Sequence, residues 1–509
     1  MAGKALDTPP VARATTAALD LSTIGGVTQT QTQNPMLIAG ERVHGDEPLE
    51  VHHPYDGSPV ATTTYATTAQ VEAAVAAADA VRDDAERLPI HVRAEALAAV
   101  SRKIQGRADE FAELITAENG KPMMWSRGEV GRAVSVFRWA AEEARQWSGE
   151  VMRLDTDPAA EGRLAYVRRV PKGPVLAISP FNFPLNLVAH KVAPALAVGA
   201  PVVLKPAPKT PLSALLLGEL LAETDLPPGM FSVVNVKNED AGDLVADPRL
   251  PVVSFTGSGP VGFSIREQVP GKHVVLELGG NAAVIVAADY ASETDLDWAS
   301  TRIANFSNYQ AGQSCIGVQR VFADASVYDD LRDRIVTKVA ALKTGDPRNE
   351  ETFVGPMIDE AAAQRVEDWV SAAVDAGATL LTGGTREGTT YAPTVLEGVP
   401  HDAKASCDEL FGPVLLLERV EGADAGIAAV NDSRFGLQAG IFTHDLQTAF
   451  RAHRELRVGG VIVGDAPSYR ADQMPYGGVK DSGVGREGVR YTMADFTYER
   501  VMVLTGLDL

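Results

Sequence analysis

The sequence contains very little cysteine and no cluster of basic residues, and both absences exclude classes of protein. Only Cys315 and Cys407 occur among 509 residues, so neither a disulfide framework nor a cysteine-rich zinc site can form, which is typical of a reducing compartment. The 46 Lys and Arg residues are outnumbered by 67 Asp and Glu residues, giving a formal net charge of −21. Without concentrated positive charge, no nucleic-acid partner is expected.

Long apolar runs are also lacking. The longest uncharged apolar stretch lies between Lys172 and Lys191, and it is interrupted by Pro174, Pro180, Pro184 and Asn186. Because a membrane helix needs about 20 unbroken apolar residues, we expect no membrane partner and a cytoplasmic protein. The polar residues 28–34 predict that residues 1–35 form a flexible tail. The nine histidines form no metal-ligand spacing, so no metal site is expected.

From residue 174 onward, short apolar runs alternate with helical segments. Strands are predicted at 175–179, 201–205, 231–236, 252–256 and 274–278. Strands buried on both faces and alternating with helices indicate an α/β fold with a doubly wound parallel sheet. Short strands at 36–64 precede helices that extend to about Trp147, and a second α/β segment begins after about Ala288.

In such a sheet, ligands bind where the strands end. The strand at 252–256 is followed by GSGPVG, residues 257–262, in which bare glycines before a helix would receive a pyrophosphate. A glycine-rich turn without a ligand is the alternative interpretation. Lys205 ends another strand, where it would contact a ribose or a phosphate. A P-loop is excluded because Phe263 occupies the position of its lysine.

Three further side chains could perform carbonyl chemistry. Asn182 follows one strand, Glu277 lies at the end of another, and Cys315 follows a helical run. Taken singly, they would be a turn former, a solvated charge and a small buried residue. Together they supply an amide donor, a base and a nucleophile, which indicates covalent chemistry on a carbonyl. Cys407 is interpreted as an ordinary small residue, with a regulatory disulfide to Cys315 as the alternative.

Seven motifs occur in a fixed order: PFNFP (180–184), KP (205–206), FTGS (255–258), LELGG (276–280), GQSC (312–315), ELFGP (409–413) and PYGGVKDSG (475–483). With these motifs the sequence resembles the NAD(P)-dependent aldehyde dehydrogenase superfamily from about Met36 to Leu504. The resemblance implies oxidation of an aldehyde to a carboxylic acid, an oxidoreductase activity.

The resemblance also implies a role for each matching residue. Cys315 would form a thiohemiacetal and then a thioester, while the Asn182 amide and the Cys315 backbone N–H hold the oxyanion. Glu277 would activate the water that hydrolyses the thioester, which favours a free acid over acylated coenzyme A as the product. The implied cofactor-binding residues are Lys205, Pro208, Gly257, Ser258, Gly262, Leu278, Glu409 and Phe411.

Cofactor and substrate preference are read from departures within these motifs. Pro208 replaces a glutamate that many NAD-preferring relatives carry, and the neighbouring cation of Lys209 would attract a 2′-phosphate. We therefore expect NADP to be accepted, and a preference for NADP over NAD stays open. Asn186, His190 and Arg470 favour a small polar or anionic aldehyde of the lactaldehyde or semialdehyde type, with Arg470 pairing a carboxylate or phosphate. A salt bridge that fixes a loop is the alternative role of Arg470.

Other functions stay open at this point. A dehydrogenase of broad or apolar aldehydes, a thiol hydrolase and a non-catalytic binding protein on the same scaffold are the alternatives. The predicted domains are an NAD(P)-binding domain at 36–148 and 171–285, a catalytic domain at 286–485, and a β-stranded oligomerisation flap at 149–170 and 486–509. The flap predicts a homodimer or homotetramer, and the sequence does not decide between them.

Overall fold

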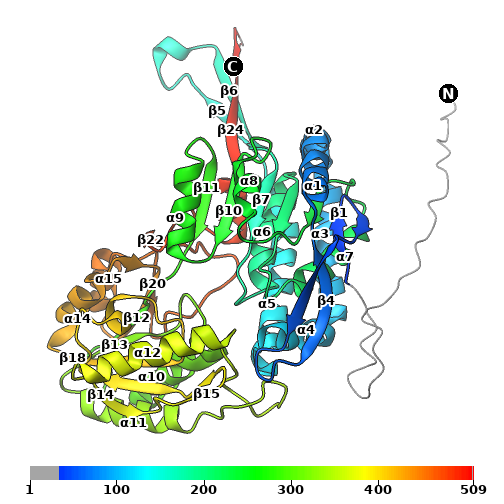
Figure 1. Ribbon diagram of the computed structural model, residues 1–509. Helices are drawn as coiled ribbons and strands as arrows, with labels where there is room; N and C mark the ends of the chain where they lie inside the picture. Colours follow the sequence, from blue (N-terminus) through cyan, green and yellow to red (C-terminus); the bar gives the residue numbers. More distant parts are fainter. Residues whose placement is uncertain (1–33, 507, 509) are drawn as a thin grey trace, which may run out of the picture.

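The computed structural model describes residues 34–506 and 508. These residues form two α/β domains and a projecting flap of antiparallel strands (Figure 1). The predicted tail at 1–35 falls almost wholly on residues 1–33, which lie outside the described residues. Asn34 is buried, and its backbone N–H donates to the carbonyl oxygen of Thr62 at 2.9 Å. The described structure therefore begins as a packed segment.

The N-terminal region contains the predicted short strands and helices. The strands are β1 (Met36–Ile38), β2 (Glu41–Val43), β3 (Glu47–His52) and β4 (Pro59–Tyr65). The helices up to residue 147 are α1 (Thr68–Ala80), α2 (Arg82–Arg87), α3 (Ile90–Gly106), α4 (Ala108–Asn119) and α5 (Met123–Gln146). Helix α1 begins with a capping box, in which the side chains of Thr67 and Gln70 each accept a hydrogen bond from the other's backbone N–H.

The first sheet has the strand order β2-β1-β9-β8-β7-β10-β11-β23. Its added strands are β7 (Val175–Ile178), β8 (Val202–Lys205), β9 (Phe231–Val233), β10 (Val252–Thr256), β11 (His273–Glu277) and β23 (Gly483–Val484). Strands β9, β8, β7, β10 and β11 run parallel, as predicted.

Helices cover both faces of this sheet. Val175 and Val202 pack in one core with α3, α5, α6 (Asn186–Val198) and α7 (Leu212–Ala222). Leu176 and Val203, one residue further along their strands, pack in another core with α1, α8 (Ala241–Ala246) and α9 (Gly259–Gln268). Alternate residues of each strand thus face opposite layers, so the sheet is doubly wound.

The second sheet has the order β14-β17-β18-β13-β12-β20-β21. Its strands are β12 (Ala283–Val286), β13 (Arg320–Asp324), β14 (Thr379–Thr382), β17 (Thr394–Glu397), β18 (Val414–Val420), β20 (Gln438–Phe442) and β21 (Gly460–Val463). Its helices are α10 (Glu293–Asn308), α11 (Tyr328–Ala340), α12 (Glu360–Asp375), α13 (Lys404–Cys407), α14 (Gly422–Asn431) and α15 (Leu446–Glu455). Two short ribbons accompany it: β15 (Arg386–Glu387) with β16 (Thr390–Tyr391), and β19 (Phe435–Gly436) with β22 (Val479–Lys480).

Strand β12 shows where the chain passes from one sheet to the other. It pairs in parallel with β13 and β20 of the second sheet, although the prediction assigned 283–285 to the first domain. The crossing falls at Gly279 and Gly280, where the turn after β11 leaves the first sheet. The apolar run of β12 resembles the strands before it, so its composition alone does not reveal the change of sheet.

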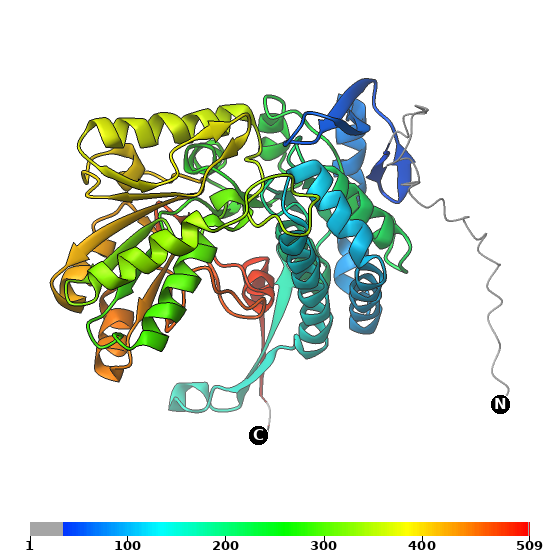
Figure 2. The ribbon, with the colours of Figure 1, turned by 90° about the horizontal axis from the view of Figure 1, so that it is seen from below.

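The flap consists of β5 (Glu150–Arg153), β6 (Arg163–Pro171) and β24 (Thr497–Thr505), paired antiparallel in the order β24-β6-β5. It projects away from both sheets in two views (Figures 1 and 2). Strand β24 lies within the predicted flap range of 486–509. Helix α16 (Val489–Asp495) falls within the predicted flap range of 486–509, yet it packs against α5 and α6 of the first domain. Within residues 34–506, no helix is both long and apolar enough to cross a membrane.

Candidate active site

A cavity of about 220 Å³ lies between the two α/β domains. Helix α5 and the turn before α6 form one wall, and the segment after α10 together with residues 468–476 forms the other. Much of the lining is apolar or aromatic, contributed by Trp125, Phe183, Leu187, Phe306, Tyr309, Ile316 and Tyr476. The charged and nucleophilic side chains in its wall are Glu129, Arg132, Cys315 and Arg470.

Cys315 is half-buried in this wall and follows a tight backbone turn. Helix α10 ends at Asn308, and Gln310, Ala311 and Gly312 then adopt positive φ angles of 53°, 53° and 68°. A Cβ atom at Gly312 would lie 2.0 Å from the carbonyl oxygen of Gly412, so only glycine fits there. The turn presents the Cys315 thiol to the cavity, where burial raises the pKa of the thiol to about 12.

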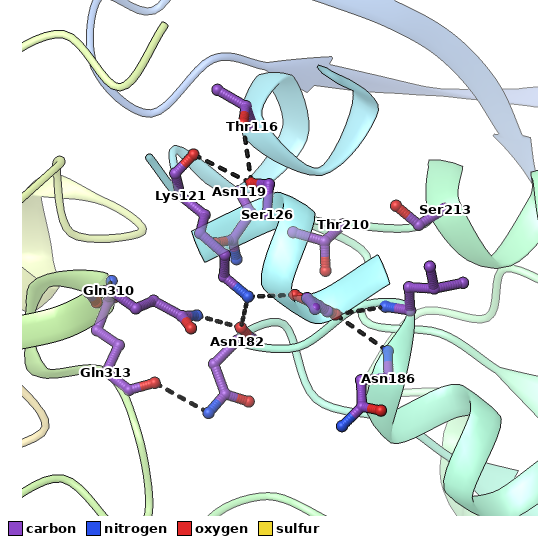
Figure 3. A network of polar contacts seen from close by, with 12 residues as sticks. Thr116, Asn119, Lys121, Ser126, Asn182, Asn186, Thr210, Ser213, Gln310 and Gln313 are labelled. Atoms are coloured by element: carbon purple, nitrogen blue, oxygen red, sulfur yellow. Dashed lines mark hydrogen bonds and ion pairs between the residues drawn. The ribbon is translucent and has the colours of Figure 1, made fainter. Parts of the chain in front are cut away.

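Asn182 is brought beside this turn by a buried polar network (Figure 3). Its side-chain Nδ2 donates to the carbonyl oxygen of Gln313 at 3.0 Å, and its own backbone carbonyl accepts from Lys121 Nζ at 2.9 Å. The side chain of Gln310 also donates to that carbonyl. An amide nitrogen carries two N–H groups, so one remains for a ligand. The Cys315 backbone N–H has no acceptor among the described residues.

Glu129 fixes the segment that follows Asn182. Its carboxylate pairs with Lys121, and neither side chain is exposed to solvent. Its Oε1 also accepts from the backbone N–H groups of Leu185 and Asn186, at 2.9 and 3.0 Å, at the start of α6. A buried ion pair of this kind is tolerated because additional hydrogen bonds satisfy both partners. The network therefore holds the Asn182 backbone in one position.

Glu277 ends β11, is buried, and both of its carboxylate oxygens lack a hydrogen-bond partner among the described residues. Burial, and then the nearby carboxylate of Glu487, raise the pKa of Glu277 well above its usual range. Burial would raise the pKa of Glu487 too, but Lys191 and Arg470 lower it to about 2. Glu277 is thus a carboxyl with free lone pairs, whereas Glu487 is a paired anion.

The three predicted substrate residues lie at different depths. Asn186 lines the cavity, and its side-chain amide has no hydrogen-bond partner among the described residues. Arg470 also lines it, donates to Glu487 at 3.0 Å and lies 3.8 Å over the ring of Tyr476. His190 is fully buried behind Arg470, 3.3 Å from its Nη2, and does not line the cavity. Burial lowers the pKa of His190 to about 4, so it is neutral.

Sequence reasoning missed Arg132, a second arginine in the cavity wall. It lies on α5, and its Nε and Nη2 donate to Asp472 at 3.2 and 3.1 Å. Oδ1 of the same Asp472 lies 3.4 Å from Nε2 of His190. Nothing in the sequence around Arg132 distinguishes it from the other arginines of α5, so only the fold reveals that it lines the same cavity as Cys315.

The carboxyl ends of β8 and β10 form a cradle suited to a dinucleotide. Lys205 is buried, its pKa is lowered to about 8 by burial, and among the described residues its Nζ bonds only the Asn238 side chain, at 2.9 Å. Helix α9 begins at Gly259, where its first N–H groups lack intrahelical acceptors, and Ser258 caps it without a side-chain hydrogen bond. A Cβ atom at Gly262 would lie 2.5 Å from Leu278 Cδ2. A free cation and bare amides of this kind fit a pyrophosphate and its ribose.

Two predicted cofactor residues approach this cradle from the second domain. Glu409 Oε1 accepts from the backbone N–H of Gly280 at 3.0 Å, and burial raises the pKa of Glu409 to about 7. A Cβ atom at Gly279 would lie 2.2 Å from the Glu409 carboxylate, so the glycine allows this close approach. Phe411 meets Phe181 edge to face, with ring centroids 5.9 Å apart. The two domains therefore close over the cradle from both sides.

The turn after β8 carries Pro208 and Lys209. Pro208 is partly exposed, and a carboxylate is absent at this position, as the sequence predicts. Lys209 pairs with Asp359, which caps the N-terminus of α12 by accepting from the Ala362 N–H at 2.7 Å. The cation that was expected to attract a phosphate is thus partly neutralised. Cys407 is exposed, and both cysteines are free thiols.

The sequence model of the aldehyde dehydrogenase family matches residues 42–502. The chain belongs to the aldehyde dehydrogenase family. It is 42% identical over 474 residues to a 3-sulfolactaldehyde dehydrogenase of Priestia megaterium, covering 93% of this chain and 98% of the relative. The family, the α/β fold and an NAD(P)-dependent aldehyde dehydrogenase activity are confirmed.

Two solved structures of aldehyde dehydrogenases resemble this one closely. Aldehyde dehydrogenase 21 from Physcomitrella patens, in complex with the reaction product succinate, has a TM-score of 0.92 and 44% identity, covering 94% of this chain and 99% of its own. An NADP-dependent glyceraldehyde-3-phosphate dehydrogenase from Bacillus halodurans, complexed with NADP, has a TM-score of 0.89 and 36% identity, covering 93% and 100%. The prediction of an NAD(P) cofactor is confirmed at this level.

Proposed function

We propose that this aldehyde dehydrogenase oxidises a small anionic aldehyde, bearing a carboxylate or a sulfonate, to the corresponding acid. The observation that carries the proposal is the presence of Arg132 and Arg470 in the same small cavity as Cys315. Each guanidinium group pairs with one buried carboxylate, Arg132 with Asp472 and Arg470 with Glu487, and the raised pKa of Glu277 favours its neutral form. The cavity thus presents two guanidinium groups beside the nucleophile.

The relatives support this substrate class by their names. One acts on 3-sulfolactaldehyde, and the structure of another holds succinate, the acid that forms from succinic semialdehyde. The two aldehydes, 3-sulfolactaldehyde and succinic semialdehyde, each carry an anionic group a few bonds from the aldehyde carbon. A guanidinium group with unused N–H donors can form two parallel hydrogen bonds to such a group. Nη1 of each arginine forms no hydrogen bond with another described residue.

The chain's own residues would perform the reaction as follows. The Cys315 thiolate attacks the aldehyde carbon, and the free Asn182 N–H with the Cys315 backbone N–H stabilises the oxyanion. NAD(P), held by Lys205, Ser258 and Glu409, supplies the hydride acceptor when it is bound. Glu277 then removes a proton from water, whose oxygen attacks the thioester carbon, and the thiolate leaves as the acid forms.

The test compares aldehydes of similar length with and without an anionic group. With wild-type enzyme, we expect succinic semialdehyde and 3-sulfolactaldehyde to exceed butanal in kcat/KM, measured by absorbance of the reduced cofactor. Arg132→Gln should lower kcat/KM for the anionic aldehydes about 10- to 100-fold and leave butanal nearly unchanged, because one charge-assisted contact is lost.

Arg127→Gln is the matched control for this test. Arg127 lies on the same helix but pairs with the exposed Glu350 and does not line the cavity. Its loss should therefore leave kcat/KM unchanged for both kinds of aldehyde. Equal wild-type kcat/KM for butanal and succinic semialdehyde would contradict an anionic substrate. A similar loss for both substrates in Arg132→Gln would show that the arginine does not select charge.

We also infer that the chain assembles through the flap as a homodimer or homotetramer, with the NAD(P)-binding and catalytic domains on either side of the cavity. Strand β24 supports this inference because it is an edge strand whose residues after Thr497 are exposed on both faces. Several of these side chains are large and apolar: Val501, Met502, Val503 and Leu504. An exposed apolar edge strand is a ready surface for pairing with another chain.

A further inference from the structure

Tyr476 touches the sulfur atom on which the proposed chemistry depends. Its phenol oxygen lies 3.0 Å from Cys315 Sγ, and its side chain lines the same cavity. The mechanism above gives this hydroxyl group no part. A phenylalanine would fill nearly the same space and keep the aromatic wall, so packing alone does not require an oxygen atom at this place.

The position of Tyr476 is held firmly from two sides. Its backbone forms an antiparallel bridge with Glu487, through hydrogen bonds of 2.9 and 2.6 Å. Its ring lies 3.8 Å beneath the guanidinium group of Arg470, which itself pairs with Glu487. A hydroxyl group on a ring clamped in this way cannot swing away from the sulfur without breaking these contacts. The fold therefore holds the Tyr476 hydroxyl group next to the Cys315 sulfur.

The direction of the hydrogen bond depends on which of the two groups, the phenol or the thiol, carries a proton. Burial raises the pKa of Tyr476 well above its usual range, so the phenol keeps its proton at any working pH. A neutral thiol could donate to the phenol or accept from it, and either bond is weak. Once the thiol ionises, its sulfur can only accept, and a bond from a neutral donor to an anion is roughly twice as strong. The contact therefore favours the thiolate over the thiol.

This preference matters because the surroundings of Cys315 otherwise oppose ionisation. Burial raises the pKa of the thiol, and any negative charge on Glu409 or Glu277 would act in the same direction, whereas the Tyr476 hydrogen bond and Arg470 lower the pKa. The cation over the ring also draws electron density from the phenol, which makes its O–H a better donor. Arg470 and Tyr476 thus act on the sulfur as one unit.

We propose that Tyr476 is a catalytic residue, which donates a hydrogen bond from its phenol to the Cys315 thiolate and so raises the population of the nucleophile. The thiol proton passes to water when the thiolate forms, and Tyr476 keeps its own proton throughout. The sulfur lone pair then forms the C–S bond while the carbonyl π pair moves to oxygen. The proposal rests on the nucleophilic role of Cys315 in the proposed function.

The experiment measures alkylation of Cys315 by iodoacetamide as a function of pH, without aldehyde or cofactor. Cys407→Ala serves as the background, because the exposed Cys407 would also react. The Cys315 peptide is quantified by mass spectrometry. We expect Tyr476→Phe to slow alkylation about 3- to 10-fold at each pH below the thiol pKa, since a roughly tenfold smaller thiolate population is partly offset by a more nucleophilic thiolate.

Tyr309→Phe is the matched control. Tyr309 is another buried tyrosine of the cavity wall, and its hydroxyl contacts Ser314, the neighbour of Cys315, instead of the sulfur. This variant should alkylate at the wild-type rate. Equal slowing in both variants would indicate a disturbed loop and overturn the proposal, as would an unchanged rate in Tyr476→Phe. A 3-fluorotyrosine at position 476, with a more acidic phenol, should at least restore the wild-type rate.

Two kinds of failure can be separated. If iodoacetamide leaves the Cys315 peptide unmodified in the wild-type background while the enzyme turns over aldehyde, the nucleophilic role and the proposed function both fail. If Cys315 is alkylated but Tyr476→Phe has no effect, only the Tyr476 proposal fails. In turnover, Tyr476→Phe should lower the rate of the first, cofactor-reducing half-reaction and leave thioester hydrolysis unchanged, which a loss of folding would not do.

Discussion

At the scale of single residues, the site is governed by how buried charges face one another. Glu277 and Glu487 influence each other's titration, yet their pKa values are displaced in opposite directions, because Lys191 and Arg470 pair with Glu487 and leave Glu277 without a partner. Only the ionised form of Glu277 can act as a base. The raised pKa therefore predicts that thioester hydrolysis is suppressed at low pH and increases as the pH rises through that pKa.

We predict that Glu487→Gln moves the acid limb of the pH–rate profile for thioester hydrolysis to lower pH, by about one pH unit. The substitution removes a repelling carboxylate and frees Lys191 and Arg470 to act on Glu277, and both changes lower the pKa of Glu277. The base form is then present at lower pH. Single-turnover hydrolysis of the acyl-enzyme, followed by mass spectrometry across a pH series, measures this limb.

Glu487→Asp is the control for that measurement, since it keeps the negative charge and should leave the limb near its wild-type position. An acid limb that stays fixed in Glu487→Gln would mean that another group limits hydrolysis at low pH.

The sequence predicts residues in motifs better than residues on ordinary helices. Cys315, Glu277 and Asn182 follow strands or a tight turn, and strand ends meet at one edge of a parallel sheet, so their grouping could be expected. Arg132 lies on a helix about fifty residues before Asn182, and only the crossing of α5 over α6 brings it to the cavity. His190 is one helical turn beyond Asn186, deep enough to be covered by Arg470 and Asp472.

At the scale of elements, the N-terminus of α12 meets the turn after β8. Asp359 caps α12 and also pairs with Lys209, so one carboxylate serves a helix of the second domain and a cation of the first. The sequence predicts Lys209 in the turn directly after a strand, which is β8, but Asp359 at the start of α12 lies about 150 residues further along. Whether Lys209 pairs with Asp359 or with a cofactor phosphate depends on how the two domains pack together, which local sequence patterns do not encode.

We predict that Asp359→Asn increases the preference for NADP over NAD by about 2- to 5-fold. Asparagine keeps the helix cap but removes the charge that pairs with Lys209, which is then free to attract a 2′-phosphate. Initial rates with both cofactors give the ratio of their kcat/KM values. Glu360→Gln, at the next residue and paired with Arg386, should leave the ratio unchanged. An unaltered ratio in Asp359→Asn would show that Lys209 does not reach the phosphate.

At the scale of the whole molecule, the flap is the feature least explained by a single chain. Its strand β24 joins β6 through nine residue pairs from Thr497–Pro171 to Thr505–Arg163, yet the outer edge of β24 has no neighbour in its sheet. The sequence predicted that residues 486–509 belong to the flap, and β24 lies within this range. It could not predict that α16 returns to the first domain, since α16 is short and its buried side chains match its neighbours' composition.

We predict that Val501→Lys weakens assembly and yields a larger share of monomer. Val501 is 57% exposed on β24, and a lysine there would place a charge in an apolar contact between copies. Size-exclusion chromatography with light scattering measures the mass. Val374→Lys makes the same change on α12, a helix that lies far from the flap strands in Figure 1, and should not alter the mass; Val374 is 38% exposed. A monomeric wild-type enzyme would contradict the assembly itself.

The pairing of β24 with β6 also sets the order in which the protein can be completed. Strand β6 leaves the ribosome more than three hundred residues before β24, so it must wait with an open edge until synthesis is nearly finished. The same holds for β23, which closes the first sheet beside β11. A nascent chain that stalls before residue 497 therefore cannot complete the flap, and the proposed assembly through the flap requires that β24 has been synthesised.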